Sequence, residues 1–228
     1  MARQYFGTDG IRGRVNTPPM TAESALRLAI AAARTFAPNG GREVVIGRDT
    51  RRSGQMIEAA LIAGLTSMGL KPVLLGIVPT PTVALMTRET GAALGLMVSA
   101  SHNKSDDNGI KLFSPAGIKL TDAEEEALEA AMASAFEGDF APPPAISTPH
   151  HMKGATTLYL ERCLETVGTD IDFSGLKIVL DCAHGAAYEV GPAALRQLGA
   201  DVTIIGDTPD GLNINAGVGS TATGLLKS

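Results

Sequence analysis

The stretch LGLMVSASHNKSDDNGIKLF, residues 94–113, decides the fold. It begins with five apolar or glycine residues, 94–98, and such an uninterrupted run is typical of a strand that is buried on both faces of a sheet. A polar segment follows directly, at the carboxyl end of the strand, where open α/β sheets bind their ligands. Residues 109–113 are again mostly apolar and predict a further strand.

The same alternation of short apolar strands and helices continues on both sides of this stretch. Thr121 and Glu124 have the spacing of a capping box, and they predict a helix from 121 to about 136 whose acidic residues lie at its positive end. Short strands between helices indicate a sheet that is covered on both faces. The predicted helices are 21–37, 53–68 and a segment from 79 onward, and the predicted strands are 43–47 and 72–77.

A second, smaller unit is predicted after a proline-rich connection. Residues 141–153 contain four prolines and no periodicity, as in a semi-rigid linker between domains. Beyond it, the pattern predicts one β-α-β unit with an additional helix before it. Two strands are too few for an independent core. We therefore expect the chain to have three parts: a first domain over 1–140, the linker over 141–153, and an incomplete second α/β domain over 154–228. The predicted helices are about 156–167 and 188–198, and the predicted strands are 176–181 and 201–205.

The last residues sharpen this expectation. Residues 220–228 provide capping residues and the first apolar positions of a helix, and the sequence stops before a second turn. The pattern favours a fragment of a longer protein.

Composition excludes several classes of protein. The 228 residues are 44% hydrophobic and carry 19 basic against 24 acidic side chains, so the net charge of −5 has the wrong sign for a nucleic-acid-binding protein. There is no apolar run of the roughly 18 residues that a membrane-spanning helix needs, and the N-terminal residues lack the apolar core of a secretion signal. We expect a cytoplasmic enzyme or binding protein. Cys163 and Cys182 have no metal-ligand spacing and are predicted to be reduced core residues.

Three segments are candidates for binding an anion. Residues 99–111 supply hydroxyls and backbone N–H groups after a strand, although Ser, Asn, Asp and Gly also make ordinary surface turns. Residues 6–14 frame two arginines with glycines, and residues 47–54 place arginines after a strand and at a helix start. For Arg48 and Asp49, an ion pair that only holds loops together is an equal alternative. An acidic protein with cations at its strand ends is suited to a phosphorylated small molecule.

Other candidates favour a structural role. His150 and His151 are adjacent, which suits metal chelation poorly. Residues 217–221 lack the lysine and the spacing of a Walker motif, and Asp181 fits a cap at the end of a strand.

Taken together, six segments in their order resemble the α-D-phosphohexomutase superfamily, and most closely its bacterial amino-sugar branch. The resemblance spans nearly the whole chain. One departure is Lys104, where the family commonly has proline. The segments are FGTDGIRG (6–13), GRDTRRSG (47–54), SASHN (99–103), NGIKLF (108–113), DCAHGA (181–186) and PDGLNIN (209–215).

The resemblance implies a three-layer α/β/α domain with a mixed sheet, followed by a truncated second domain of the same kind. It implies an isomerase that moves phosphate between the 6- and 1-positions of glucosamine through a bisphosphate, toward UDP-N-acetylglucosamine and the cell wall. Ser101 is then the phosphoserine. Catalytic roles fall on Arg12, Lys111 and His102, and substrate phosphate is bound by Arg12, Arg48, Asn103 and Lys111.

Lys111 is the candidate for proton transfer, since a lysine among other cations loses its proton more readily. One Mg²⁺ is implied on the phosphate of Ser101, with aspartate ligands beyond residue 228, so the fragment alone is expected to be inactive. The expected partner is a small-molecule sugar phosphate, with no nucleic acid or membrane, for a monomer or homodimer. Two alternatives stay open: an enzyme of the mannose or glucose phosphate branches, and a non-catalytic module that binds sugar phosphates.

Overall fold

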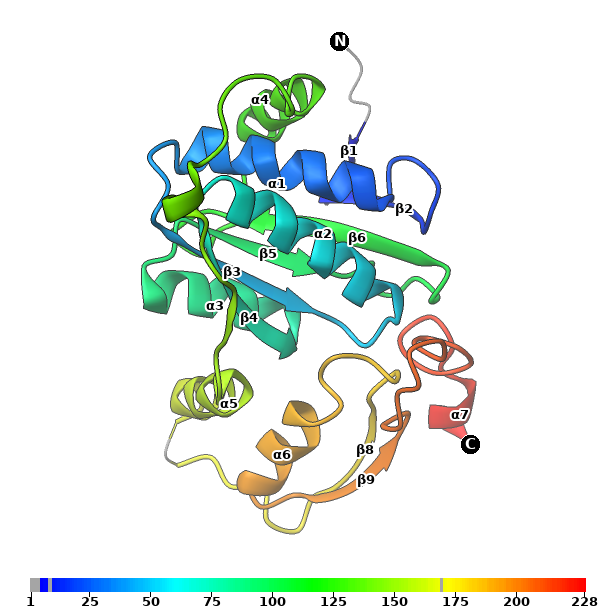
Figure 1. Ribbon diagram of the computed structural model, residues 1–228. Helices are drawn as coiled ribbons and strands as arrows, with labels where there is room; N and C mark the ends of the chain where they lie inside the picture. Colours follow the sequence, from blue (N-terminus) through cyan, green and yellow to red (C-terminus); the bar gives the residue numbers. More distant parts are fainter. Residues whose placement is uncertain (1–4, 8–9, 169) are drawn as a thin grey trace.

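The computed structural model describes residues 5–7, 10–168 and 170–228 (Figure 1). Seven strands form one sheet in the order β1-β2-β6-β5-β3-β4-β7. The pairs among β3, β4, β5 and β7 are parallel, and the pairs β5–β6, β6–β2 and β2–β1 are antiparallel, so the predicted mixed sheet is confirmed. The strands are β1 (Phe6–Gly7), β2 (Gly10–Arg14), β3 (Glu43–Arg48), β4 (Lys71–Ile77), β5 (Leu94–Val98), β6 (Asp107–Phe113) and β7 (His150–His151).

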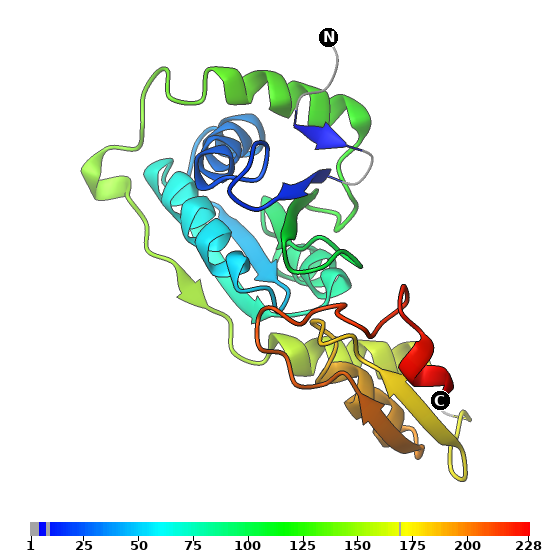
Figure 2. The same ribbon diagram turned by 90° about the vertical axis from the view of Figure 1, so that its right-hand side faces the viewer.

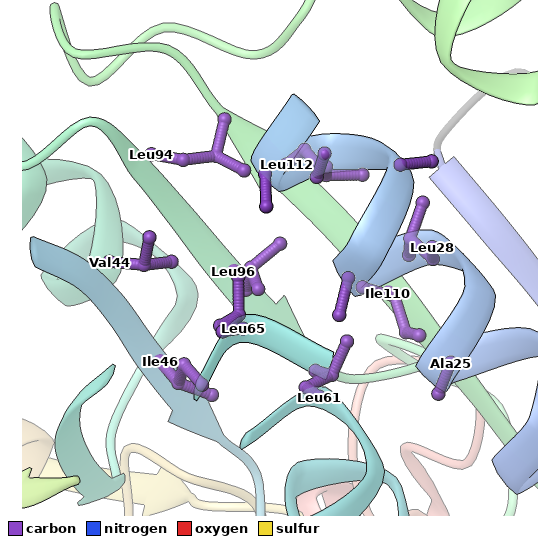
Figure 3. Packing of buried hydrophobic residues seen from close by; sticks show 14 of the residues in the cluster. Ala25, Leu28, Val44, Ile46, Leu61, Leu65, Leu94, Leu96, Ile110 and Leu112 are labelled. Atoms are coloured by element: carbon purple, nitrogen blue, oxygen red, sulfur yellow. The ribbon is translucent and has the colours of Figure 1, made fainter. Parts of the chain in front are cut away.

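Helices cover both faces of this sheet, which completes three layers (Figure 1). On one face, Leu61 and Leu65 point toward Ile46, Leu96 and their neighbours in a single buried cluster (Figure 3). The other face has its own cluster, to which α3 contributes Val83 and Met86 and α5 contributes Ala155. The helices are α1 (Ala22–Phe36), α2 (Ser53–Ser67) and α4 (Asp122–Ala133) on the first face, and α3 (Thr80–Thr90) and α5 (Ala155–Thr166) on the second.

Local sequence signals set the helix starts. The hydroxyl oxygen of Thr21 accepts a hydrogen bond from the backbone N–H of Ser24, at 3.1 Å, and so caps α1. Thr121 and Glu124 form the reciprocal capping box that their spacing predicts at the start of α4. The helix ends lie within about three residues of their predicted positions.

The second unit is the predicted β-α-β arrangement. Strands β8 (Lys177–Asp181) and β9 (Asp201–Ile205) pair in parallel, and α6 (Val190–Gln197) connects them. A single helical turn, α7 (Gly224–Lys227), follows near the end of the sequence. Figure 2 shows the loops that follow β9, in orange and red, against the strand ends of the larger sheet.

The strands β1, β2 and β7 carry no periodic signal in the sequence and were not among the predicted elements. Residues 10–14, part of the candidate anion-binding segment 6–14, form β2, where Ile11 pairs with Ile110 of β6. His150 and His151 lie within the predicted linker but pair with Val73 and Leu74 of β4. Such short strands are defined by the edge that they pair with rather than by their own side chains. Thr8 and Asp9 of the first motif lie outside the described residues.

The predicted linker, residues 141–153, lies along the larger unit. The backbone N–H of Ala141 donates to Ser67 O at 3.0 Å, and a short 3-10 turn, η1 (Pro143–Ala145), follows. The domain boundaries themselves stay predictions. In the part of the chain that the structure describes, no helix is both long enough and apolar enough to cross a membrane.

Candidate functional site

A cavity of about 380 Å³ lies between the two units. The larger unit contributes residues at the ends of its strands and the start of α3, and the smaller unit contributes the loops after β8 and β9. Carboxyl ends of strands from both units therefore meet at one place, as expected for ligand binding in α/β folds. Its lining includes Asp49, Met97, Ser101 and His102 on one side and Cys182 and Asn215 on the other.

The serine loop, residues 99–103, forms part of this lining. It leaves β5 after the backbone N–H of Ser99 donates to Gly109 O at 2.9 Å. Ser101 has a φ of +55°, in the left-handed region that few residues other than glycine adopt. Its backbone N–H donates to Ser99 Oγ at 3.1 Å, while the residue itself is exposed and lines the cavity. Ser99 is thus a loop-shaping neighbour, and Ser101 is the accessible hydroxyl.

Arg51 lies beneath the serine loop with its side chain completely buried. It forms an ion pair with Asp49, and its Nη2 donates to the carbonyl oxygens of Ser101, at 3.3 Å, and of Asn103. Burial lowers the pKa of Arg51, and the adjacent Asp49 carboxylate opposes this shift. The Asp49 carboxylate therefore offsets part of the cost of burying this guanidinium, which brings positive charge close to Ser101.

Arg48 and Asp49 each form an ion pair, but not with each other, which was the structural alternative that the sequence left open. Asp49 pairs with Arg51, and Arg48 Nε lies 3.2 Å from Glu58 Oε2, with both of these side chains mostly buried. The structure thus places the predicted phosphate-binding residue Arg48 against a carboxylate of α2.

Arg12 and Lys111 lie on the strands next to the serine loop. Arg12 of β2 is opposite Gly109 of β6, and Lys111 of β6 is opposite Met97 of β5. Because side chains alternate along strands and directly paired residues share a face, Arg12, Lys111 and Met97 all belong to one face of the sheet. Met97 lines the cavity. The positive charge of Arg12 also lowers the pKa of Arg51, so these cations are neighbours.

We call Arg12, Arg51 and Lys111 the basic cluster. A cluster of this kind creates a positive potential that attracts a dianionic phosphate and stabilises negative charge that develops in a reaction. Arg51 was assigned no role from the sequence, although it is the second of the three arginines in the 47–54 motif.

The two remaining predicted site residues differ in their surroundings. His102 is exposed and lines the cavity beside Ser101. Asn103 is partly buried, and its Nδ2 donates to Asp107 Oδ2 at 2.8 Å, so one of its donors is used within the loop.

The smaller unit reaches the serine loop through Asn215. Its Nδ2 donates to the carbonyl oxygens of Ser101, at 3.0 Å, and of Asn103, at 2.9 Å. Asn215 belongs to the quoted PDGLNIN motif, but neither its spacing nor its residue type indicated this contact.

Asp181 caps the end of β8, as one of its sequence interpretations proposed. Its carboxylate accepts from the backbone N–H groups of Ala183, at 2.8 Å, and Gly219, at 2.6 Å.

The next residue, Cys182, is a free and buried cysteine that lines the cavity. Burial, and then the negative charges of Asp207 and Asp181, raise the pKa of its thiol to about 11. Cys163, the other predicted core cysteine, is also free but only partly buried.

The described residues do not by themselves fit a magnesium ion. Within residues 5–7, 10–168 and 170–228, no group of three or more His, Cys, Asp or Glu side chains is placed to hold a metal. The nearby carboxylates are also engaged, because Asp49 pairs with Arg51 and Asp181 with backbone N–H groups.

Comparison with known proteins places this geometry in context. A family model described as phosphoglucomutase/phosphomannomutase, alpha/beta/alpha domain I, matches residues 3–139. The phosphoglucosamine mutase of Hyphomonas neptunium is 72% identical over 228 residues, which cover 100% of this chain and 51% of that protein. The phosphoglucosamine mutase of a Jannaschia species is 53% identical, with coverage of 97% and 49%. The chain spans about half the length of the curated relatives it matches.

Solved structures show the same fold. A putative phosphomannomutase from Thermus thermophilus matches with a TM-score of 0.78 and 32% identity, over 92% of this chain and 47% of that one. A phosphoglucomutase/phosphomannomutase family protein from Burkholderia thailandensis matches with a TM-score of 0.76 and 25% identity, over 92% and 45%.

Proposed function

Because the chain belongs to the phosphoglucomutase/phosphomannomutase family, we propose that it carries the phosphoserine part of a phosphoglucosamine mutase. The reaction would interconvert glucosamine 6-phosphate and glucosamine 1-phosphate through a bisphosphate, in the cytoplasm, on the route to UDP-N-acetylglucosamine. The choice of glucosamine as the sugar is supported by the names of the two relatives described above, whereas the similar Thermus thermophilus structure is titled a putative phosphomannomutase.

One observation carries the proposal. An exposed serine hydroxyl, at Ser101, lines the cavity between the units, and the basic cluster adjoins it from below and from the neighbouring strands. Phosphoryl transfer needs cations around the spreading negative charge more than it needs covalent machinery. An ordinary surface turn would not require a buried arginine beneath it and two further cations on the neighbouring strands.

The proposed step starts from phosphorylated Ser101. A sugar hydroxyl attacks the phosphorus, the bond from phosphorus to Ser101 Oγ breaks, and a bond from phosphorus to the sugar oxygen forms. The proton of the attacking hydroxyl ends on Ser101 Oγ, and we assign its transfer to Lys111. The bisphosphate then reorients, and the reverse step returns its other phosphoryl group to Ser101. Arg12 and Arg51 stabilise the charge of the transferred group in both directions.

We propose that His102 and Asn103 contact the phosphate from the serine loop, and that Arg48 does so only if its pairing with Glu58 is released. We also propose that the full-length protein uses magnesium. Because the described residues do not by themselves fit the ion, we expect the 228-residue chain to show no mutase turnover by itself.

The test is the phosphorylation of Ser101 and its consequence for turnover. The full-length protein, incubated with glucosamine 1,6-bisphosphate, should gain one phosphoryl group on the peptide that contains Ser101, as seen by mass spectrometry. Ser101→Ala should abolish both the label and the conversion of glucosamine 6-phosphate. Ser105→Ala makes the same chemical change four residues away and should preserve both.

The result also separates the alternatives. Undiminished turnover in Ser101→Ala would sink the assignment. Binding of glucosamine 6-phosphate by calorimetry without any phosphorylation would favour a non-catalytic module instead. Faster turnover on mannose or glucose phosphates would move the protein to those branches of the family.

A further inference from the structure

The main chain of the serine loop is held from two sides. Arg51, in the larger unit, donates to the carbonyl oxygens of Ser101 and Asn103. Asn215, in the smaller unit, donates to the same two oxygens at 3.0 and 2.9 Å. A side-chain carboxamide has two N–H donors, and both of these bonds come from its one nitrogen. Its whole donor capacity is therefore directed at this loop.

We propose that Asn215 is a positioning residue for Ser101. Its carboxamide, together with Arg51, holds the serine loop in the left-handed turn that presents Ser101 to the cavity, so that phosphoryl transfer depends on how the smaller unit is seated. This inference rests on the function proposed above, because it names a residue that prepares the same serine for reaction.

The conformation of Ser101 explains why a clamp is needed. A φ of +55° is unfavourable for a residue with a Cβ atom. Such a conformation persists only where the surrounding contacts over-determine it. The larger unit provides the bond to Ser99 Oγ and those from Arg51. The smaller unit provides the bonds from Asn215. Without them, Arg51 is the one side chain among the residues that the structure describes that donates to both the Ser101 and the Asn103 carbonyl oxygens.

The choice of asparagine follows from two demands on position 215. The residue has a φ of +56°, which asparagine tolerates better than most residues with a side chain. It is only 7% exposed, so water cannot readily replace its amide donors. Its backbone N–H donates to Ala183 O at 2.9 Å, which fixes it to the loop after β8. Aspartate would keep the shape but would turn a carboxylate oxygen toward two carbonyl oxygens.

Asn213 provides a matched control. It lies two residues away, and its carboxamide bonds within its own loop, donating to Thr208 O at 3.0 Å and accepting from the backbone N–H of Asp210 at 3.0 Å. Asn213→Asp therefore makes the same change of charge and removes the same number of donors, without touching the serine loop.

The first measurement is amide hydrogen exchange of the 228-residue chain, followed on peptides from residues 99–108. In Asn215→Asp we expect exchange in this segment to rise at least tenfold, and in Asn213→Asp we expect it to stay within twofold of the unchanged chain. Asn215→Gly is the second variant: glycine accepts the left-handed backbone, so it removes the amide even if the aspartate variant fails to fold.

The second measurement is steady-state turnover of the full-length protein. Misplacement of a reacting group by about 1 Å costs on the order of 100-fold in rate. We therefore expect kcat to fall about 10- to 100-fold in both Asn215 variants while KM changes by less than about threefold. A merely structural loss would instead reduce the amount of active enzyme and leave the exchange pattern of the remaining folded protein unchanged.

The two proposals can fail separately. If the unchanged full-length protein has no mutase activity, the proposed function fails, and hydrogen exchange still decides whether Asn215 holds the serine loop. If the unchanged protein is active but exchange and kcat in Asn215→Gly match the control, the positioning role of Asn215 is overturned and the function stands.

Discussion

The strands β5 and β8 both have apolar residues at their centres, but they differ in how far these residues are buried. All five residues of β5 are buried, and Leu96 at its centre has no exposed surface. In β8 the central Val179 is 53% exposed. The difference arises from the neighbours, because β5 lies between two strands and under helices on both faces, whereas β8 pairs with β9 alone. An apolar run thus predicts a strand, but the number of partners decides whether that strand becomes core.

The smaller unit gains its position from the larger one. Its loops are held by hydrogen bonds from Thr50 Oγ1 to His184 O, at 2.6 Å, and from the backbone N–H of Arg52 to Gly211 O, at 2.9 Å. The helix α5 also packs on the larger unit, where Ala155 is buried in the same cluster as Val83. The cavity and the serine loop lie where these contacts cross between the units, so the comparison bears directly on the site.

The largest difference in stability is expected between alanine substitutions at the centres of these two strands. Leu96→Ala creates a cavity in the core and should lower the free energy of unfolding by about 2–5 kcal/mol. Val179→Ala removes a half-exposed side chain and should cost no more than about 0.5 kcal/mol. Urea denaturation followed by circular dichroism measures both values. Equal losses would contradict the proposed difference between the units.

A smaller difference in stability is expected between alanine substitutions at two glycines, one in each unit. A Cβ on Gly95 of β5 would lie 2.1 Å from the buried Thr87 Oγ1, so Gly95→Ala should destabilise the chain by about 1–3 kcal/mol through overpacking.

A Cβ on Gly191 of α6 would meet Leu180 at an ordinary 3.4 Å, and alanine favours a helix over glycine by up to about 1 kcal/mol. Gly191→Ala is therefore the matched control and should be neutral or stabilising. Thermal unfolding of the two variants compares them, and a destabilised Gly191→Ala would show that α6 packs as tightly as the core of the larger unit.

These contrasts also show what the sequence could predict. The central strands and the helix starts follow from local patterns, such as the apolar run 94–98 and the capping box at Thr121, because burial on both faces and capping both act over a few residues. The strands β2 and β7 escape prediction because their partners lie far away in the sequence.

The candidate site divides in the same way. The motif resemblance predicts Ser101 and the cations of the neighbouring strands as site residues, and the structure places Ser101 at the cavity. The double contact of Asn215 with the serine loop joins residues more than 100 positions apart, and no local spacing encodes it. The pairing of Arg48 with Glu58 and of Asp49 with Arg51 likewise depended on which way each side chain turned after β3.

The smallest effect near neutral pH is expected from Cys182, which reports on the cavity between the units. With a pKa of about 11, only about 0.1% of its thiol is ionised at pH 8, compared with roughly a quarter for an ordinary cysteine. Iodoacetamide should therefore modify Cys182 slowly in the folded chain, and the rate should rise about tenfold per pH unit up to pH 11. Mass spectrometry of the peptide that contains Cys182 measures this rate, and the urea-unfolded chain supplies the control with an ordinary thiol.

The same shift predicts the direction of the pH effect on folding. The folded-state pKa of Cys182 is raised above its unfolded value of about 8.5, so the folded chain binds the thiol proton more tightly. Its contribution to stability is complete below pH 8.5 and is lost as the pH rises toward 11. A folded Cys182 that titrates near pH 8.5 would mean that the thiol is open to water, and hence that the smaller unit does not close the cavity against the larger one.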